Sequence, residues 1–542
     1  MINFLLRLSG MAFLLSCTVI LAQGDELFLN DAGIIPAPAS IVRSSSGGTF
    51  TFTSSTPVSV IPEAQDAVNE LDRRFSTAAG YTFRKIRREK ESGILFSHAH
   101  KKDSLGTEGY TISVTQRRII IRANSREGFF YAVQSLLQLL PAEIVGTSLR
   151  KDIQWNVPPV EIRDVPKFPY RSFMLDSGRQ FQTVEFIKRY LDILAQYKIN
   201  TFHWHLTEGQ GWRIEIKRYP KLTEIGSRVA DGPEQHGFYT QTDIKEIVEY
   251  ARRKCITVVP EIDLPGHSEA ALIAYPEFSC RKTPPASVME YSSHLFCAGN
   301  ESTYIFLQNV LAEVCELFPG PYVHLGGDEA PKDIWDSCTV CRGSIEKNGL
   351  KNSHDLQLYF SARLARFLKE RNKQCILWGD VVEQEGMRLP DNVVIYWWNY
   401  RKKQSTALDA ALADGYSVIA GSNYYCYLNF PVTPWSKYKE DRTFDLRTAY
   451  EKNPSDIRQP SPLVIGMSAA LWTDWNVRMS MIDRRVFPRL LVLAEQMWSR
   501  ERIPFERYYQ NLKTFHYPRL LVQNIKIGPA LKDEVPEGYQ WD

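Results

Sequence analysis

Two neighbouring carboxylates that follow a short apolar segment are the part of this sequence best suited to acid–base chemistry. The segment 323–329 reads Val-His-Leu-Gly-Gly-Asp-Glu, and its first half predicts a short buried strand. Side chains alternate along a strand, so His324 and Asp328 should share one face, and the glycine pair lets the chain turn Glu329 toward the same cavity. Two carboxyl groups this close cannot both ionise cheaply, so one should keep a proton that it can donate. The alternative is a helix N-terminus, where Asp328 and Glu329 only complement the helix dipole.

Eight apolar segments alternate with amphipathic ones in the last two thirds of the chain. The predicted strands are 173–175, 201–206, 256–262, 322–325, 376–378, 393–397, 417–420 and 464–470. Helices predicted between them include 184–197, 304–318 and 354–372. Alternation of this kind predicts a parallel sheet, and eight units predict an α/β fold with a closed (β/α)8 TIM barrel.

Polar and aromatic side chains follow directly after these predicted strands. They are Asp176, Arg179, His205, Glu208, Asp263, His267, Asp328 and Glu329, and later Trp378, Trp397, Tyr427 and Trp472. In a barrel the carboxyl ends of all strands open on one face, which is the face that carries catalysis. The sequence therefore predicts one shared site built from many strand ends.

The remaining chain divides into a leader, a small domain and a tail. Residues 1–22 combine Arg7 with an apolar run and predict a secretory signal peptide, so we expect a secreted or periplasmic protein; lipoprotein cleavage at Cys17 is a weaker alternative. Residues 23–165 predict a small α+β domain, with a hairpin over 110–121 and a helix over 126–140. The barrel is expected over 166–520, followed by a C-terminal tail, 521–542.

Composition limits the partners that the chain can have. The net charge is +3 and the basic residues are scattered among acidic ones, so nucleic acid is not an expected partner. Beyond the leader no segment is long and apolar enough to predict a membrane span. The sequence leaves the oligomeric state open.

Nine cysteines are present, and eight of them follow the leader. Cys280 with Cys297, and Cys338 with Cys341, flank predicted loops and could form disulfides in an oxidising compartment. The pair 338–341 lacks a second Cys or His pair in the sequence around it, which argues against zinc. We therefore predict no metal and no cofactor.

The strand-end motifs resemble glycoside hydrolase family 20, the β-N-acetylhexosaminidases. The matching segments are Leu175–Arg179, Phe202–Leu206 with Gly211–Arg213, Pro260–His267 and His324–Glu329. The small α+β domain ahead of the barrel also fits this family. The resemblance implies an exo-acting enzyme that takes an oligosaccharide or glycoconjugate and releases terminal β-linked GlcNAc or GalNAc.

The resemblance also implies a substrate-assisted mechanism, in which the 2-acetamido oxygen of the sugar attacks C1. Glu329 would be the general acid and then the base. Asp328 would orient the acetamido group and stabilise its developing positive charge. Tyr427 would donate a hydrogen bond to the acetamido oxygen.

Aromatic and basic side chains would bind the sugar in this interpretation. Trp378, Trp397 and Trp472 would wall the pocket, with core packing as the alternative for each, whereas Trp398 should point the other way, into the core. Arg179 would hold the 3- and 4-hydroxyls, unless it only pairs with Asp176. His267 would support the acidic pair or serve as a structural histidine.

Three positions depart from the common family pattern: Glu208, Asn429 and Asp474. Glu208 replaces an aspartate, so its reach into the site is open. Asn429 removes a negative charge at the 4- and 6-hydroxyl end, which favours acceptance of 6-sulfated GlcNAc. Phe430 supplies no cation and Asp474 keeps one carboxylate there, and both count against sulfate.

Two other functions fit part of the same pattern. A secreted glycan-binding protein could use the Trp-lined pocket without the acid pair. A two-carboxylate glycosidase would need a nucleophile about 5 Å from the acid, and Glu208 or Glu261 are the candidates.

Overall fold

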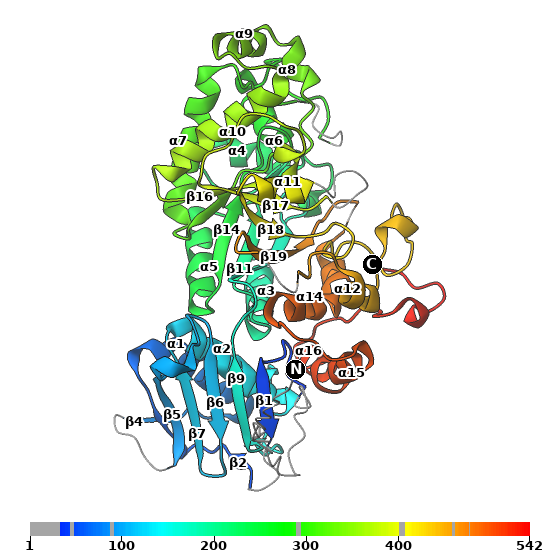
Figure 1. The fold of residues 1–542 in the computed structure, drawn as a ribbon. Coiled ribbons are helices and arrows are strands. Elements are labelled where there is room, and N and C mark those ends of the chain that lie inside the picture. The colour runs from blue at the N-terminus through cyan, green and yellow to red at the C-terminus, as the bar shows by residue number, and fades with distance from the viewer. Residues whose placement is uncertain are drawn as a thin grey trace, which may run out of the picture.

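The computed structural model describes residues 33–43, 48–86, 92–288, 294–399, 407–457, 461–475 and 477–541. The predicted signal peptide, 1–22, and Cys17 lie outside these residues. A seven-stranded sheet and a barrel are stacked on each other, and the C-terminal helices lie beside both (Figure 1). Among the described residues, no helix has the length and apolarity needed to cross a membrane.

The N-terminal domain is a mixed sheet with two helices on the side that faces the barrel (Figure 1). The strand order is β1 (Ser40–Arg43), β9 (Val160–Asp164), β6 (Tyr110–Val114), β7 (Arg118–Ala123), β5 (Gly93–His98), β3 (Pro57–Ser59) and β4 (Arg84–Ile86). Strands β6 and β7 form the predicted antiparallel hairpin, and every second residue of each is buried. The covering helices are α1 (Gln65–Ala79) and α2 (Arg126–Gln138). Helix α2 begins after Ser125, whose hydroxyl accepts the N–H of Gly128.

Eight parallel strands close into the predicted barrel. In order they are β10 (Tyr170–Asp176), β11 (Thr201–His205), β14 (Thr257–Glu261), β15 (Tyr322–His324), β16 (Gln374–Trp378), β17 (Val393–Trp397), β18 (Ser417–Ala420) and β19 (Val464–Leu471). Each corresponds to one strand predicted from the sequence. The (β/α)8 barrel preceded by a small domain is therefore the fold of this chain.

Helices surround the barrel, and four of the five longer ones begin at a side-chain cap. The longer ones are α3 (Val184–Gln196), α5 (Gln241–Arg253), α7 (Glu301–Leu317), α10 (Ser353–Lys369) and α14 (Arg489–Trp498). Thr183, Thr240, Asn300 and Asn352 each accept a backbone N–H in the first turn of the helix that follows. These caps accept backbone N–H groups that have no partner within the helix, so each of these helices starts at a defined residue.

The barrel separates two hydrophobic cores. Tyr170, Val259, Ile376, Trp378, Val394, Tyr396 and Ile419 form the small core inside it. The large core lies between the strands and the helices and continues into the N-terminal domain. The interior is thus filled by side chains, which leaves room for a ligand only at the ends of the strands.

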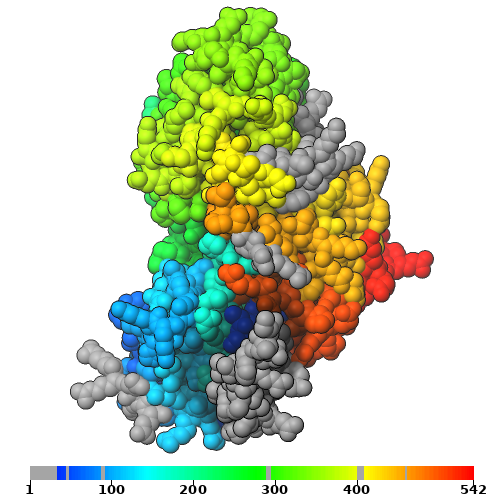
Figure 2. Space-filling model, viewed as in Figure 1, coloured from blue at the N-terminus to red at the C-terminus, as the bar shows by residue number. Residues whose placement is uncertain are grey.

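Buried ion pairs join the two domains. Arg171 at the start of the barrel pairs with Glu108 at 2.7 Å, and Lys198 pairs with Asp164 at 2.8 Å with both side chains fully buried. In the space-filling view the blue N-terminal domain packs directly against the barrel and the orange C-terminal helices (Figure 2). After α16 (Tyr517–Leu521) the chain returns to the barrel, where Gly528 N–H donates to the Phe487 carbonyl and Trp541 is buried.

The cysteines do not form the disulfides that the sequence suggested. All eight in the described residues are free thiols. The structure leaves Cys280, Cys297, Cys338 and Cys341 unbonded to one another and gathers their four sulfurs into a single cluster. Cys280 and Cys297 supply the second cysteine pair that the sequence around Cys338 lacks, so the argument used against zinc was also wrong.

Candidate active site

Four polar side chains end four neighbouring strands at the same level of the barrel. In the strand register Asp176 is opposite His205, His205 is opposite Glu261, and Glu261 is opposite His324. Parallel strands that end together bring their last residues to one face. The polar layer therefore forms the base of a site on the carboxyl side of the barrel.

Glu261 holds this layer together. Its carboxylate lies 2.9 Å from His203 Nε2, 2.5 Å from His205 Nδ1 and 3.2 Å from His324 Nδ1, and it accepts the indole N–H of Trp378 at 2.8 Å. Burial alone would raise the pKa of Glu261, but the three imidazoles outweigh it and the pKa lies well below its usual range. Glu261 is therefore an ionised group that fixes the floor of the site.

The glycine turn after β15 places the acidic pair above this floor. Gly326 and Gly327 have φ of +65° and +108°, values that side chains disfavour. A Cβ at Gly326 would lie 1.6 Å from Asp263 Oδ1, and the same oxygen accepts the Gly327 N–H at 3.2 Å. The next helix, α8 (Asp333–Ser337), begins four residues beyond Glu329, so the interpretation of the acidic pair as a helix start is wrong.

His267 connects the acidic pair to the polar layer. Its Nδ1 lies 2.8 Å from Glu208 Oε1, and its Nε2 lies 3.5 Å from Glu329 Oε2 and 3.8 Å from Asp328 Oδ2. Burial lowers the pKa of His267, but the negative charges of Glu208 and Asp328 raise it by more, so the pKa lies well above its usual value. His267 is thus a buried cation among three carboxylates.

The two acidic side chains differ in their surroundings. Burial and the neighbouring Glu329 raise the pKa of Asp328, against the opposing effect of His267. The hydrogen bond from His267 lowers the pKa of Glu329, whose side chain is 47% exposed. The surroundings therefore move the pKa values of the two carboxyl groups in opposite directions. Glu329 also has φ of +47°, a strained backbone conformation for a residue with a side chain.

Arg179 forms the ion pair with Asp176 considered from the sequence, while its contact with the sugar hydroxyls stays a prediction. Its guanidinium pairs with Asp176 at 2.9 Å and with Glu208 at 3.0 Å, and it lies 5.2 Å from the ring centre of Trp472. The same side chain also lines the pocket. Glu208 itself is buried behind Arg179 and His267, so it reaches the site only through these two partners.

The pocket above these groups has a volume of about 610 Å³, enough for a sugar ring and its substituents. It is lined by Arg179, His267, Asp328, Glu329, Trp378, Trp398, Asn423, Tyr427, Asn429, Phe430, Arg442, Trp472, Asp474 and Trp475. Trp378 and Trp472 meet at 5.8 Å between ring centres, and Trp398 stacks on Tyr427 at 6.4 Å with an interplanar angle of 19°. Aromatic faces thus form its walls.

Trp397 and Trp398 have exchanged the places expected from the sequence. Residues Val394 and Tyr396 of β17 point into the barrel, so Trp397 points outward into the large core, where it is fully buried. Trp398 follows on the inward side and lines the pocket, with its indole N–H donating to Asp380 Oδ2 at 2.6 Å. Trp397 is therefore not a pocket residue, and Trp398 takes its place.

One end of the pocket carries the residues that depart from the family pattern. Asn429 Nδ2 donates to Asp474 Oδ1 at 3.0 Å, and Tyr438 donates to the same oxygen at 3.3 Å. Burial raises the pKa of Asp474. Arg442 also lines the pocket, with its guanidinium 4.7 Å from the ring centre of Trp475.

The sequence did not single out several residues that the fold brings here. Asp380, just after β16, accepts the indole N–H of Trp398 and the backbone N–H of Glu329, and burial raises its pKa to about 8. Its place directly after Trp378-Gly379 at a strand end was the signal available. Arg442 comes from the long connection after β18, and Trp475 comes from the turn that follows β19; in neither place does strand periodicity predict which side chains reach the site.

Comparison with known families decides the relationship that these motifs indicate. Residues 168–501 match the model of glycosyl hydrolase family 20, catalytic domain, and residues 31–165 match the model of glycosyl hydrolase family 20, domain 2. The chain belongs to glycosyl hydrolase family 20. The resemblance inferred from the strand-end motifs is thereby confirmed.

Known family 20 proteins share both sequence and architecture with the chain. A β-hexosaminidase of Porphyromonas gingivalis is 37% identical over 484 residues, which cover 86% of this chain and 60% of that protein. The crystal structure of a β-N-acetylhexosaminidase from Bacteroides fragilis aligns with a TM-score of 0.86 and 47% identity over 94% of this chain and 99% of that one. An exo-β-N-acetylglucosaminidase from Vibrio harveyi, solved with N-acetylglucosamine, gives a TM-score of 0.80 and 29% identity, covering 94% and 81%.

Proposed function

We propose that this protein is an exo-acting β-N-acetylhexosaminidase that removes terminal β-linked GlcNAc or GalNAc from glycans with retention of configuration. The observation that carries the proposal is the acidic pair Asp328 and Glu329 at the mouth of a tryptophan-walled pocket. The names of the relatives support the same activity. The pocket ends on the filled barrel interior, which supports release of a terminal sugar rather than cleavage within a chain.

The acetamido group of the substrate is the proposed nucleophile. Asp328 accepts the acetamido N–H and stabilises the positive charge that develops as the carbonyl oxygen attacks C1. Tyr427 hydrogen-bonds to that oxygen, and Trp378 and Trp472 pack around the acetamido methyl group. Glu329 protonates the leaving oxygen and then activates the water that opens the oxazolinium ion.

Binding of the sugar should shift the pKa values of both carboxyl groups toward the roles that the mechanism requires. In the free protein the pKa of Asp328 is raised and that of Glu329 is lowered. An acetamido N–H beside Asp328 favours its ionised form, and a sugar that covers Glu329 removes water from a side chain that is 47% exposed. Both effects favour an ionised Asp328 beside a protonated Glu329, which is the state that the leaving group needs.

The burial of other carboxylates argues against a two-carboxylate mechanism. Glu261 is fully buried and bonded to three histidines and Trp378, and Glu208 is 4% exposed and held by Arg179 and His267. Neither has room to approach the anomeric carbon from inside the pocket. A sugar-binding protein without catalysis would have no need for a strained Glu329 beside a buried cation.

A 6-sulfated GlcNAc is a finer substrate that the pocket supports. Asn429 is uncharged, and its amide donates a hydrogen bond to the carboxylate of Asp474. Arg442 adds a cation to the pocket lining that the sequence pattern did not reveal. A matched pair of aryl β-GlcNAc substrates with and without 6-sulfate tests this. Comparable kcat/KM for the two, with Arg442→Gln impairing only the sulfated one, supports the idea, whereas strong rejection of sulfate by the wild type contradicts it.

Aryl glycosides test the main proposal. The wild type should cleave aryl β-GlcNAc and leave aryl β-glucoside intact, and a thiazoline mimic of the oxazolinium ion should inhibit it. Equal cleavage of both glycosides, or indifference to the thiazoline, would favour a two-carboxylate enzyme. Sugar binding without any cleavage would favour a binding protein.

We also propose that the protein is exported to the periplasm or the medium. N-terminal sequencing of the mature protein from the native host would test this.

A further inference from the structure

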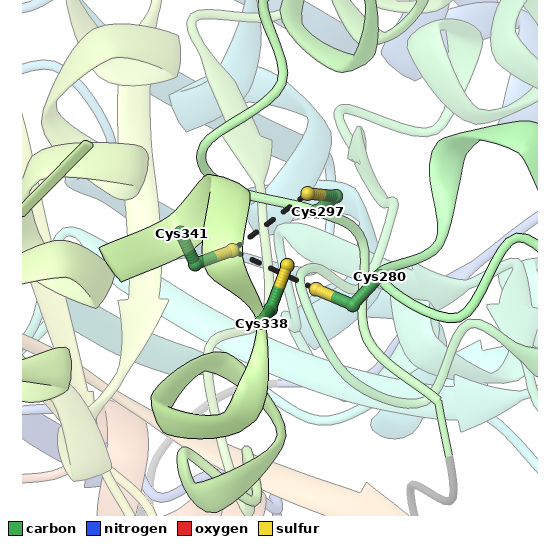
Figure 3. A group of neighbouring side chains, drawn as sticks. All are labelled: Cys280, Cys297, Cys338 and Cys341. Atoms are coloured by element: carbon green, nitrogen blue, oxygen red, sulfur yellow. Dashed lines mark hydrogen bonds between the residues drawn. The ribbon is translucent and has the colours of Figure 1, made fainter. Parts of the chain in front are cut away.

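Four cysteines from two separate loops meet beside the barrel (Figure 3). Cys280 and Cys297 lie between α6 (Glu269–Ala274) and α7, whereas Cys338 directly precedes α9 (Thr339–Lys347) and Cys341 lies in its first turn. Their four Sγ atoms all lie within 4.8 Å of one another. Cys297 and Cys341 are buried, and the other two are partly exposed.

The sulfur distances fit a metal site better than a disulfide. Cys341 Sγ lies 3.6 Å from Cys280 Sγ and 3.7 Å from Cys297 Sγ. A disulfide requires about 2.05 Å. Zinc binds thiolates at about 2.3 Å in a tetrahedron, which places neighbouring sulfurs about 3.8 Å apart. Cys341 Sγ is nearly equidistant from two other sulfurs, as expected for ligands around one metal, whereas a disulfide would bring it close to only one of them.

We infer that Cys280, Cys297, Cys338 and Cys341 bind one structural Zn²⁺ as thiolates. Four protein ligands complete the tetrahedron, so no position is left for water or substrate and the site has no catalytic role. Four thiolates around Zn²⁺ carry a net charge of −2. Arg281, Lys282 and Arg342 adjoin these cysteines in the sequence and supply positive charge nearby.

The loops that carry the cysteines already pack closely. A Cβ at Gly299 would lie 2.4 Å from the Val340 carbonyl oxygen and 2.8 Å from Cys341 Cα, so only glycine allows this approach. Trp335 Nε1 donates to the Phe296 carbonyl at 3.1 Å, which joins the same two loops a second time. The packing of the two loops therefore already holds the four cysteines close together, without a metal.

The same loops carry the acidic site. The first runs from β14 to α7 and contains His267, and the second runs from β15 to α10 and contains Glu329. A metal that joins them would hold the 3.5 Å contact between His267 and Glu329 from outside the pocket. Its loss should loosen this contact without removing any residue that touches the sugar.

Metal analysis of the full-length protein tests the inference. Protein produced with added zinc and then dialysed should retain about one Zn²⁺ per chain, and Cys297→Ser or Cys341→Ser should lose it. Cys315→Ser is the matched control, since Cys315 is a partly exposed cysteine in α7 outside the cluster, and it should keep the metal. Chelation should lower the Tm of the wild type and of Cys315→Ser but not that of Cys297→Ser.

Two measurements on the wild type keep the inference testable if the serine variants do not fold. Protein refolded with Co²⁺ should show the thiolate charge-transfer band and the intense visible bands of tetrahedral cobalt. The mass of the denatured, unreduced chain should correspond to free thiols at all four positions. A metal-free protein whose mass is lower by the four hydrogens of two disulfides would overturn the inference, as would retention of zinc by both serine variants.

Discussion

The Nε2 atom of His267 lies 3.5 Å from Oε2 of Glu329, and both residues have left-handed backbone conformations, with φ of +50° and +47°. The other ring nitrogen of His267 is held by Glu208 at 2.8 Å. Strain of this kind persists where the surrounding contacts enforce it, and it concentrates at functional sites. The pair therefore connects the ionised layer inside the barrel to the proposed proton donor at its mouth.

Replacement of His267 should move the pH profile of the enzyme. The hydrogen bond from His267 lowers the pKa of Glu329, so His267→Gln should raise that pKa. Since Glu329 must be protonated to act as the acid, the alkaline limb of kcat/KM should shift to higher pH, together with a lower maximum rate. A profile that keeps its alkaline limb in place, or shifts it to lower pH, would contradict this role.

The same variant should change how stability depends on pH. The pKa of His267 is raised in the folded protein, so the imidazolium stabilises the fold fully below the unfolded pKa of about 6.5. This contribution disappears as the pH rises through the folded pKa. The difference in unfolding free energy between the wild type and His267→Gln should therefore be largest in mild acid and shrink at alkaline pH, as urea titrations would measure.

Loss of the proposed proton donor should affect chemistry and not folding. Glu329→Gln removes the acid and the base, so kcat should fall by about 10² to 10⁴-fold. Because the side chain is 47% exposed, Tm should stay close to that of the wild type. Glu370→Gln is the control, since Glu370 is 74% exposed on the outer surface and should leave kcat unchanged. Near-normal turnover by Glu329→Gln would rule out its role.

Glu261 should matter for stability more than for binding. Glu261→Gln removes a buried charge that faces three histidines, and the loss of one partner of a buried ionic network costs roughly 3–5 kcal/mol. Denaturant unfolding of the purified variant measures this cost. A change below about 1 kcal/mol would show that the charge at Glu261 is not needed for stability.

The two adjacent tryptophans should separate packing from sugar binding. Trp397→Ala should lower the unfolding free energy by about 3–5 kcal/mol, since the side chain is fully buried in the large core. Trp398→Phe should leave stability nearly unchanged but reduce kcat/KM, because it removes a pocket wall and the donor to Asp380. Measurement of Tm and kcat/KM on both variants decides the assignment, and the reverse pattern would restore the sequence-based one.

Much of the fold could be predicted because barrel strands and helices leave strong local patterns. The eight strands, the hairpin and the longer helices follow from periodicity, and the site follows from the rule that strand ends converge. The sequence could not predict which side chains of β17 face inward, because all five are apolar or aromatic and buried. Only the closed barrel decides that Tyr396 faces inward and Trp397 outward.

Contacts between segments that are far apart in the sequence could not be predicted either. Cys280 and Cys341 are 61 residues apart, and nothing in either segment indicates that their loops meet. Arg442 and Trp475 also reach the pocket from loops without periodicity. The ionised state of Glu261 depends on three histidines from two other strands, β11 and β15, which only the register brings together.

The central claim is that the sugar supplies its own nucleophile, and the most direct test changes that nucleophile alone. Aryl β-glucosaminides whose N-acetyl methyl group carries zero, one, two or three fluorines keep nearly the same size while the carbonyl oxygen becomes steadily less nucleophilic. The account predicts that kcat falls steeply with each added fluorine. A kcat that stays constant across the series would contradict it.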